Sequence, residues 1–260
     1  MVAHKTNRKF VIITILVLAI IFAGSYFAYK TINNKPTTET QLSSEANVQQ
    51  PTTSPQISQQ SINRTKYSTT DPASVWLIVN KNSKLDSAYQ PAELAVPNVP
   101  LQAGKSDQEM SLRNDAATEL EAMFAAAKEQ GVQLKLASGY RSYELQGYYY
   151  NSLVRSLGAE EANKVSAKPG TSEHQTGLAV DIASYSNDVC HLETCFGTTA
   201  EGQWLANNAH TFGFIIRYPE SKTDVTGYNY EPWHIRYVGK ELAAELQKTG
   251  QTLEEFFSTQ

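Results

Sequence analysis

The alternating segment at residues 177–183 constrains the fold of this chain more than any other feature. Leu, Val and Ile occupy every second position, and the positions between them hold Gly, Ala and Asp181. Successive side chains of a strand point to opposite faces, so one face would enter an apolar core while the other presents a carboxylate. Residues 233–238 alternate in the same way and place His234 and Arg236 on one face. We therefore expect a sheet with an open polar patch built on these two strands.

A further histidine, His174, lies just upstream of the first strand, after a Pro-Gly-Thr turn. If the two strands are neighbours, His174, Asp181 and His234 come together. Two imidazoles and one carboxylate are a ligand set for Zn²⁺, and three protein ligands leave a fourth position open, as in catalytic zinc sites. The sequence therefore predicts one zinc ion per chain, held by these three residues. The His-Glu-x-x-His pattern of helix-borne zinc proteases does not occur in the sequence.

Residues 1–30 predict a cytoplasmic flank and a membrane anchor. Three basic residues, the last at Lys9, precede residues 10–29, which are interrupted only by one Thr, one Gly and one Ser. This run is long enough to cross a hydrocarbon core of about 30 Å. The preceding positive charge places the remainder of the chain outside the cytoplasm, in a single-pass arrangement. The alternative is a signal peptide cleaved near residues 23–25, which would give a secreted protein.

Residues 31–66 predict a flexible linker. Seven Thr, six Gln and five Ser occur there without any aromatic residue, so the segment cannot bury enough apolar surface to offset its ordering entropy. Residues 67–260 remain for one extracytoplasmic domain with its own core. The net charge is −4, and no Lys/Arg cluster occurs beyond the N-terminal flank. Nothing in this charge pattern indicates a nucleic-acid partner.

Cys190 and Cys195 are the only cysteines of the chain. In an exported domain we expect a disulfide between them, and closing so short a loop would contribute about 2 kcal/mol. The alternative is a second metal site formed by Cys190, His191 and Cys195, for which no further cysteine pair is available.

Helical and strand patterns follow one another without a regular βαβ rhythm. A capping box at Ser106 and a glycine at position 131 predict one amphipathic helix between them. Further helices are expected up to Leu157, from Thr199 to Gly213, over residues 240–248 and from residue 252. Strands are expected at residues 132–136 and 214–218, in addition to the two strands of the polar patch. The expected fold class is α+β.

Three motifs together resemble the exported D-alanyl-D-alanine carboxypeptidases of the zinc LAS type, the VanY-like peptidases, which include L,D-carboxypeptidases. The motifs are Ser-x-His-x-x-Gly-x-Ala-x-Asp at residues 172–181, Glu-Pro-Trp-His at residues 231–234 and Ser-Gly-Tyr-Arg-Ser at residues 138–142. The same superfamily contains lysostaphin-type peptidases and the hedgehog signalling domain. The resemblance implies their fold, a small central and mostly antiparallel sheet flanked by helices.

The resemblance also implies roles for residues around the metal. Glu231 matches the family's catalytic glutamate, a general base that takes a proton from water and returns it to the leaving amine. Arg141 matches a residue that binds the scissile carbonyl oxygen as charge develops. With Arg141, Gln146 and Ser172 would hold the terminal carboxylate of the substrate. For Gln146 and Ser172 the alternative is that each caps a turn or a helix.

The substrates implied by the resemblance are peptidoglycan stem peptides outside the cell. Removal of the terminal D-alanine from a pentapeptide is the first expectation. Cleavage of the L–D bond of a tetrapeptide is the alternative, because the family members resemble each other in all the motif residues. A non-catalytic zinc-containing module that binds the wall is a second alternative, and the presence of Glu231 argues against it.

Overall fold

The computed structural model describes residues 62–186 and 189–258. A four-stranded sheet has the order β3 (Leu134–Ser138), β4 (Ala179–Ser184), β6 (Glu231–Tyr237) and β5 (Phe214–Tyr218). All its neighbouring strands are antiparallel. A smaller sheet pairs β1 (Leu94–Ala95) with β2 (Leu112–Arg113). The expected α+β class with a small antiparallel sheet is confirmed.

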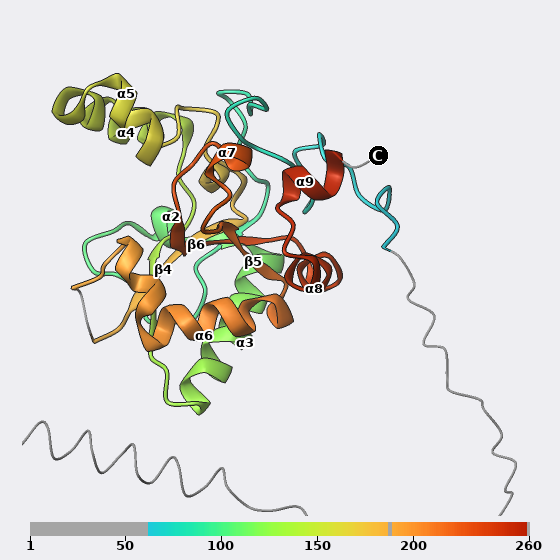
Figure 1. Ribbon diagram of the computed structural model, residues 1–260. Coiled ribbons are helices and arrows are strands. Elements are labelled where there is room, and N and C mark those ends of the chain that lie inside the picture. Colours follow the sequence, from blue (N-terminus) through green and yellow to red (C-terminus); the bar gives the residue numbers. More distant parts are fainter. Residues whose placement is uncertain (1–61, 187–188, 259–260) are drawn as a thin grey trace, which may run out of the picture. The chain divides into compact units, whose positions relative to one another are not determined.

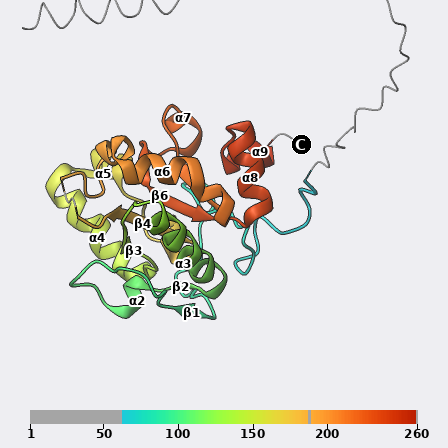
Figure 2. The same cartoon turned by 90° about the horizontal axis from the view of Figure 1, so that it is seen from below.

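Helices surround the larger sheet. Figure 1 shows α3 and α6 on one face of the sheet, and the view from below in Figure 2 shows both of them in front of the strands. Helices α4 and α5 lie together at one end (Figure 1). The helical elements are α2 (Asp107–Met110), α3 (Asn114–Glu129), α4 (Tyr143–Leu157), α5 (Ala159–Val165), η1 (Glu173–Thr176), η2 (Thr194–Thr198), α6 (Ala200–Asn208), η3 (Ala209–Phe212), α7 (Thr223–Thr226), α8 (Lys240–Thr249) and α9 (Leu253–Ser258).

The main core lies between the sheet and the helices α3 and α6. On β4, Val180 and Ile182 enter this core together with the preceding Leu178, as the alternation predicts. Leu120 of α3 and Leu205 of α6 cover them and are fully buried. Since successive side chains of a strand alternate, the same packing turns Asp181 toward the opposite face. The apolar face of β4 thereby fixes where its carboxylate points.

The prediction of a single helix between Ser106 and Gly131 is wrong, because the structure has two helices there. The capping box of Ser106 is present, but α2 ends at Met110 and the backbone at Ser111 is extended, with φ −85° and ψ 156°. The segment after β3 forms hydrogen bonds with the end of α2 and the residue that follows it: Gly139 donates its N–H to the carbonyl of Glu109, and Tyr140 donates to the carbonyl of Ser111. These bonds compete with continued helical bonding, so the chain extends into β2 before α3 begins.

The first described residues contact the domain. Ile62, which the sequence assigns to the linker, packs against the apolar cluster of α8 and α9. Lys66 forms an ion pair with Glu241 of α8. The expected anchor and residues 31–61 of the expected linker lie outside the described residues. Within residues 62–186 and 189–258, no helix has both the length and the hydrophobicity that a bilayer crossing requires.

Candidate active site

Three side chains meet on the polar face of the larger sheet. Asp181 of β4 and His234 of β6 are direct partners in the antiparallel ladder, and His174 lies in η1, just before β4. Nε2 of His174 lies 3.2 Å from Oδ2 of Asp181, and Nδ1 of His234 lies 2.9 Å from Oδ1. One ligand atom from each residue lies within 4.8 Å of the other two. The structure thus brings together the three residues that the sequence predicts as metal ligands.

Gly177 joins η1 to β4 in a conformation that side chains disfavour. Its φ is +69°, in the left-handed region, and it ends the turn that carries His174. A Cβ atom at this position would lie 2.9 Å from Cδ2 of Leu94. The glycine of the first motif is therefore required by both the backbone and the neighbouring side chain, and it sets the distance between His174 and Asp181.

The chemistry of the cluster fits a zinc ion. Nδ1 of His174 lies 2.6 Å from the carbonyl oxygen of Gly139, so this nitrogen is the one that carries hydrogen and Nε2 is left as a ligand. Burial lowers the pKa of His174, which favours the neutral ring that a metal needs. Burial alone would raise the pKa of Asp181, but His174 and His234 hold it well below its usual range, so the carboxylate is ionised.

The charge around His234 also favours a cation. Burial opposes the protonated ring, yet the hydrogen bond to Asp181 and the nearby carboxylate of Glu173 raise the pKa of His234 to about 9. Carboxylates that stabilise an imidazolium to this degree would stabilise a metal ion in the same place. The three ligands are each at most 5% exposed, so water competes weakly for them.

Glu231 begins β6 and lies beside the cluster. Its Oε2 is 4.0 Å from Nδ1 of His234, the nitrogen that faces Asp181. Burial raises the pKa of Glu231 to about 7; His234 opposes the rise and Asp181 adds to it. A carboxyl group with a pKa near neutrality can both accept and return a proton at neutral pH, as a general base requires.

Arg141 follows β3 and points its guanidinium toward the same site. Its Nη2 donates to Oγ of Ser138 at 3.0 Å and lies 3.8 Å from Oδ2 of Asp181. Its Nη1 donates to Oε1 of Gln146 at 2.9 Å, while the amide nitrogen of Gln146 donates to the carbonyl of Ala167 at 2.7 Å. Gln146 in α4 therefore orients Arg141, and its amide is fixed at both ends.

One cavity of about 520 Å³ connects all these groups. Its lining includes every residue predicted as ligand, catalytic or substrate-binding, namely Arg141, Gln146, Ser172, His174, Asp181, Glu231 and His234. Ser172 precedes η1 and makes no capping hydrogen bond there, within the described part of the chain. The side chain of Ser172 therefore does not cap η1.

Nothing in the sequence indicated that two further groups of residues belong to the site. Tyr218, at the end of β5, stacks on His234 with ring centroids 4.9 Å apart, and no motif points to it. Glu173 is fully buried beside the ligands and pairs with Arg217 and Arg236. The alternation of β6 places Arg236 on the same face as His234, and a buried guanidinium requires a buried counter-ion. The sequence does not show that Arg236 is buried or which acidic residue would pair with it.

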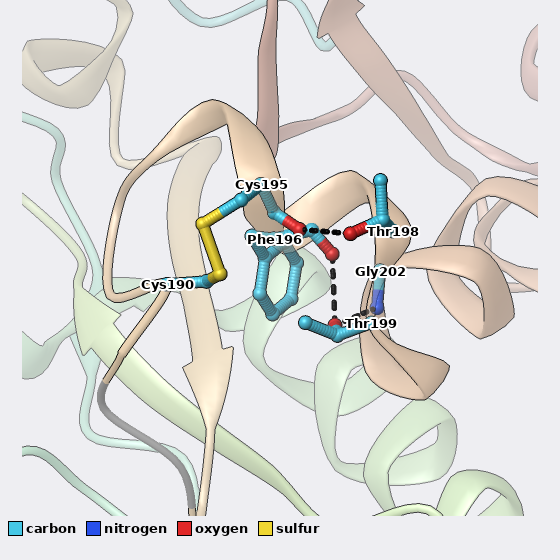
Figure 3. Close-up of a disulfide and its surroundings, with 6 residues drawn as sticks. All are labelled: Cys190, Cys195, Phe196, Thr198, Thr199 and Gly202. Atoms are coloured by element: carbon cyan, nitrogen blue, oxygen red, sulfur yellow. Dashed lines mark hydrogen bonds between the residues drawn. A yellow bond between two sulfur atoms is a disulfide. The ribbon is translucent and has the colours of Figure 1, made fainter. Parts of the chain in front are cut away.

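The expected disulfide is present between Cys190 and Cys195, with sulfurs 2.06 Å apart. Figure 3 shows Phe196 beside it, with hydrogen bonds from Thr198 and Thr199 closing the following turn. The enclosed His191 and Leu192 line the active-site cavity. The disulfide therefore replaces the alternative of a metal site at these cysteines, and its loop forms part of the cavity wall.

Comparison with known proteins identifies the family to which the chain belongs. The family model VanY, D-alanyl-D-alanine carboxypeptidase, matches residues 109–240. The putative carboxypeptidase YodJ of Bacillus subtilis (strain 168) is 46% identical over 187 residues, which are 72% of this chain and 68% of the relative.

Two solved structures are similar in both sequence and fold. The LdcB LD-carboxypeptidase, whose structure was used to explain peptidoglycan recognition, is 45% identical to this chain and has a TM-score of 0.68. The match covers 72% of this chain and 87% of the LdcB chain. A mutant of the vancomycin resistance D,D-pentapeptidase VanY, from a VanB-type resistance cassette and in complex with Zn(II), is 34% identical with a TM-score of 0.58, over 72% and 99% of the two chains. From these matches and the His–Asp–His cluster we conclude that the chain belongs to the VanY family of D-alanyl-D-alanine carboxypeptidases, which are zinc metallopeptidases.

Proposed function

We propose that this chain removes the C-terminal D-alanine from peptidoglycan stem peptides, with one Zn²⁺ per chain held by His174, Asp181 and His234. The observation that carries the proposal is that one cavity contains this ligand set, the Glu231 carboxyl group and the Arg141 guanidinium. When bound, zinc supplies a Lewis acid and makes water nucleophilic near neutral pH. Protein side chains would carry out proton transfer, stabilise the developing negative charge and bind the substrate carboxylate.

Glu231 is the general base of the proposed reaction. It is the carboxyl group beside the ligands whose pKa burial raises to about 7. At neutral pH it can therefore take the proton of the attacking water and deliver it to the nitrogen of the leaving D-alanine. Asp181, whose pKa is held low by the two histidines, stays ionised and cannot exchange protons in this range. The two carboxyl groups thus divide the roles of base and ligand.

Arg141 is the proposed electrophilic group. Ser138 and Gln146 hold its two Nη atoms before substrate arrives, so little reorganisation is needed when negative charge develops on the scissile carbonyl oxygen. A carboxypeptidase must also recognise a free carboxylate, and a guanidinium is suited to that ligand. Ser172 lines the same cavity and can offer its hydroxyl to the carboxylate. Gln146 contributes by orienting Arg141.

The test is mass spectrometry of muropeptides after incubation with the zinc-loaded protein. Defined pentapeptide and tetrapeptide stems are supplied separately. Conversion of the pentapeptide to the tetrapeptide supports the proposal. Absence of any cleavage, with zinc bound, would instead favour the non-catalytic module.

L,D-carboxypeptidase activity on tetrapeptide stems is the second candidate. It is favoured by the similarity to the LdcB LD-carboxypeptidase, which has the higher identity and TM-score of the two structures described above. The same experiment separates the two reactions, because an L,D-enzyme converts the tetrapeptide to the tripeptide and leaves the pentapeptide intact.

We further propose that residues 10–29 anchor the protein in the cell membrane, with the peptidase domain on the outer side. The basis is the apolar run and the basic residues before it. The linker would then let a fixed enzyme reach stem peptides in the nearby wall. Alkaline extraction of membranes tests the anchor: an integral protein stays in the pellet, whereas a cleaved and secreted form appears in the medium.

A further inference from the structure

The buried carboxylate of Glu173 lies next to the His234 ring, on the side that faces away from Asp181. Nδ1 of His234 faces Asp181 and Glu231, whereas its Nε2 lies 3.7 Å from Oε2 of Glu173. Among the described residues, neither of these two atoms has a hydrogen-bond partner. The separation exceeds a hydrogen bond, and a shift of roughly 0.5 Å would close it. The two unsatisfied atoms therefore face each other inside the protein.

The other oxygen of Glu173 is firmly held. Oε1 accepts from Nε of Arg217 at 2.8 Å and from Nη1 of Arg236 at 2.8 Å. The side chains of all three residues are 0% exposed. Two guanidinium groups thus fix one carboxylate oxygen and leave the second free for the imidazole.

Arg217 extends the network to the C-terminal helix. Its Nη1 donates to Oε2 of Glu254 at 3.0 Å, and its Nη2 donates to Oε1 of the same carboxylate. Asn80 also donates to Glu254, at 3.1 Å. Two arginines and two glutamates balance in charge, which is the condition under which buried ions persist. Asn80 and Glu254 lie outside residues 109–240, so segments beyond the family match complete the network.

The network has the layout of a carboxylate–histidine–metal triad. Histidine ligands usually donate their second ring N–H to a carboxylate, carbonyl or water, which fixes the ring orientation and makes the ligand nitrogen more basic. For His174 that acceptor is the carbonyl of Gly139. For His234 the structure places Glu173 in the corresponding position.

We propose that Glu173 is a positioning residue for His234, and that Glu254 of α9 holds Glu173 in place through Arg217. The proposal rests on the zinc site of the proposed function. It makes the C-terminal helix, which contributes no residue to the lining of the cavity, a determinant of zinc affinity.

The test measures zinc affinity of the full-length chain, using Zn²⁺ in competition with a chromogenic chelator. Glu173→Gln should weaken zinc binding by about 10–100-fold, the usual effect of losing such an outer partner. Because this change leaves two buried arginines with one carboxylate, the double variant Glu173→Gln/Arg236→Gln restores the charge balance. It should fold, with a melting temperature of the zinc-free protein near the wild type, and bind zinc as weakly as the single variant.

Helix α9 offers a matched pair of variants, one within the network and one outside it. Glu254→Gln breaks the bond to Arg217 and should weaken zinc binding by several-fold. Glu255→Gln, on the same helix, removes a carboxylate that pairs with Lys222, away from the ligands, and should leave zinc affinity unchanged. Cobalt substitution gives a second readout, because an altered visible spectrum in the Glu173 variants reports a changed ligand geometry, which a loss of stability alone would not produce.

The outcomes separate the two proposals. Wild-type zinc affinity and an unchanged cobalt spectrum in the folded double variant would overturn the positioning role of Glu173. Equal losses in Glu254→Gln and Glu255→Gln would overturn the specific link through Arg217. A wild-type chain that binds no zinc at all would instead remove the metal site of the proposed function.

Discussion

Asp181 and His234 are register partners across β4 and β6, and their side chains meet at 2.9 Å. The hydrogen-bonded ladder of the sheet therefore sets the distance between two ligands that are far apart in sequence. The apolar residues on the other face of β4 hold the strand in this register, because a slip by one position would turn Asp181 into the core. The metal site is thus a consequence of how the core packs.

Asp181→Asn should abolish zinc binding while the protein stays folded. The amide keeps the shape of the side chain but removes the negative charge that makes it a ligand for a divalent cation. Equilibrium dialysis with elemental analysis measures bound zinc, and circular dichroism checks the fold. Asp224→Asn, at an exposed position of α7, is the matched control and should retain zinc. A full equivalent of zinc in the Asp181 variant would contradict the ligand assignment.

Glu231→Gln should lower kcat for release of D-alanine by about 10²–10⁴-fold, the usual contribution of a general base. Zinc content should be unchanged, because this residue is assigned no ligand role. Steady-state kinetics on a pentapeptide substrate, with metal analysis of the same sample, measures both. Glu220→Gln, an exposed glutamate in the loop before α7, provides the control. Near-normal kcat in the Glu231 variant would require another base.

Arg141→Lys should lower kcat by about 10²–10³-fold, as when a donor to the developing oxyanion is removed. Lysine cannot hold Ser138 and Gln146 with two separate nitrogens, so its charge would not be fixed in place. Gln146→Ala should cause a smaller fall, on the order of tenfold, through loss of one hydrogen bond to the guanidinium. Arg155→Lys, exposed on α4, should have no effect. Equal kinetics of all three variants would exclude a role for Arg141 in the reaction.

The orientation of the metal ligands could be predicted from the sequence because strand alternation is a local pattern, whereas the roles of Glu231 and Arg141 came from the family resemblance. The two alternating strands fix which face Asp181 and His234 occupy, and Gly177 marks the turn that positions His174. The break after Met110 could not be predicted, since it depends on bonds from residues 139 and 140 to carbonyls nearly thirty positions earlier. A capping box predicts where a helix begins, but the end of this helix depends on hydrogen bonds from the distant segment that follows β3.

The buried ion network could not be predicted from the sequence, for a related reason. Glu173, Arg217 and Glu254 come from η1, β5 and α9, and no spacing rule links them. Charged residues are ordinarily assigned to the surface, and only the packing of β5 and β6 shows that Arg217 and Arg236 are buried. Tyr218 was missed in the same way, because its contact with His234 depends on the pairing of β5 with β6.

The ion pair at Glu254 should make stability depend on pH. Burial opposes ionisation, but Arg217 lowers the pKa of Glu254 below its ordinary value of 4.5. A carboxyl group whose pKa is lower in the folded state stabilises the fold above the unfolded pKa and loses that contribution as the pH falls. In zinc-free protein, Glu254→Gln should therefore be less stable than wild type at pH 7, and the difference should shrink below about pH 4. Denaturant titrations across this range measure it, and a constant difference would contradict the prediction.

Replacing both cysteines of the Cys190–Cys195 disulfide by serine should destabilise the domain by about 2 kcal/mol, the chain-entropy value for so short a loop. Guanidinium unfolding measures this loss, and the oxidised wild type treated with reductant should reproduce it. Weaker substrate binding is expected too, because His191 and Leu192 lie within the loop and line the cavity, whereas the metal ligands lie outside the loop. KM for the pentapeptide should therefore rise while kcat and zinc content stay near the wild-type values. A fall in kcat with unchanged KM would show that the loop acts on the catalytic groups and not on substrate binding.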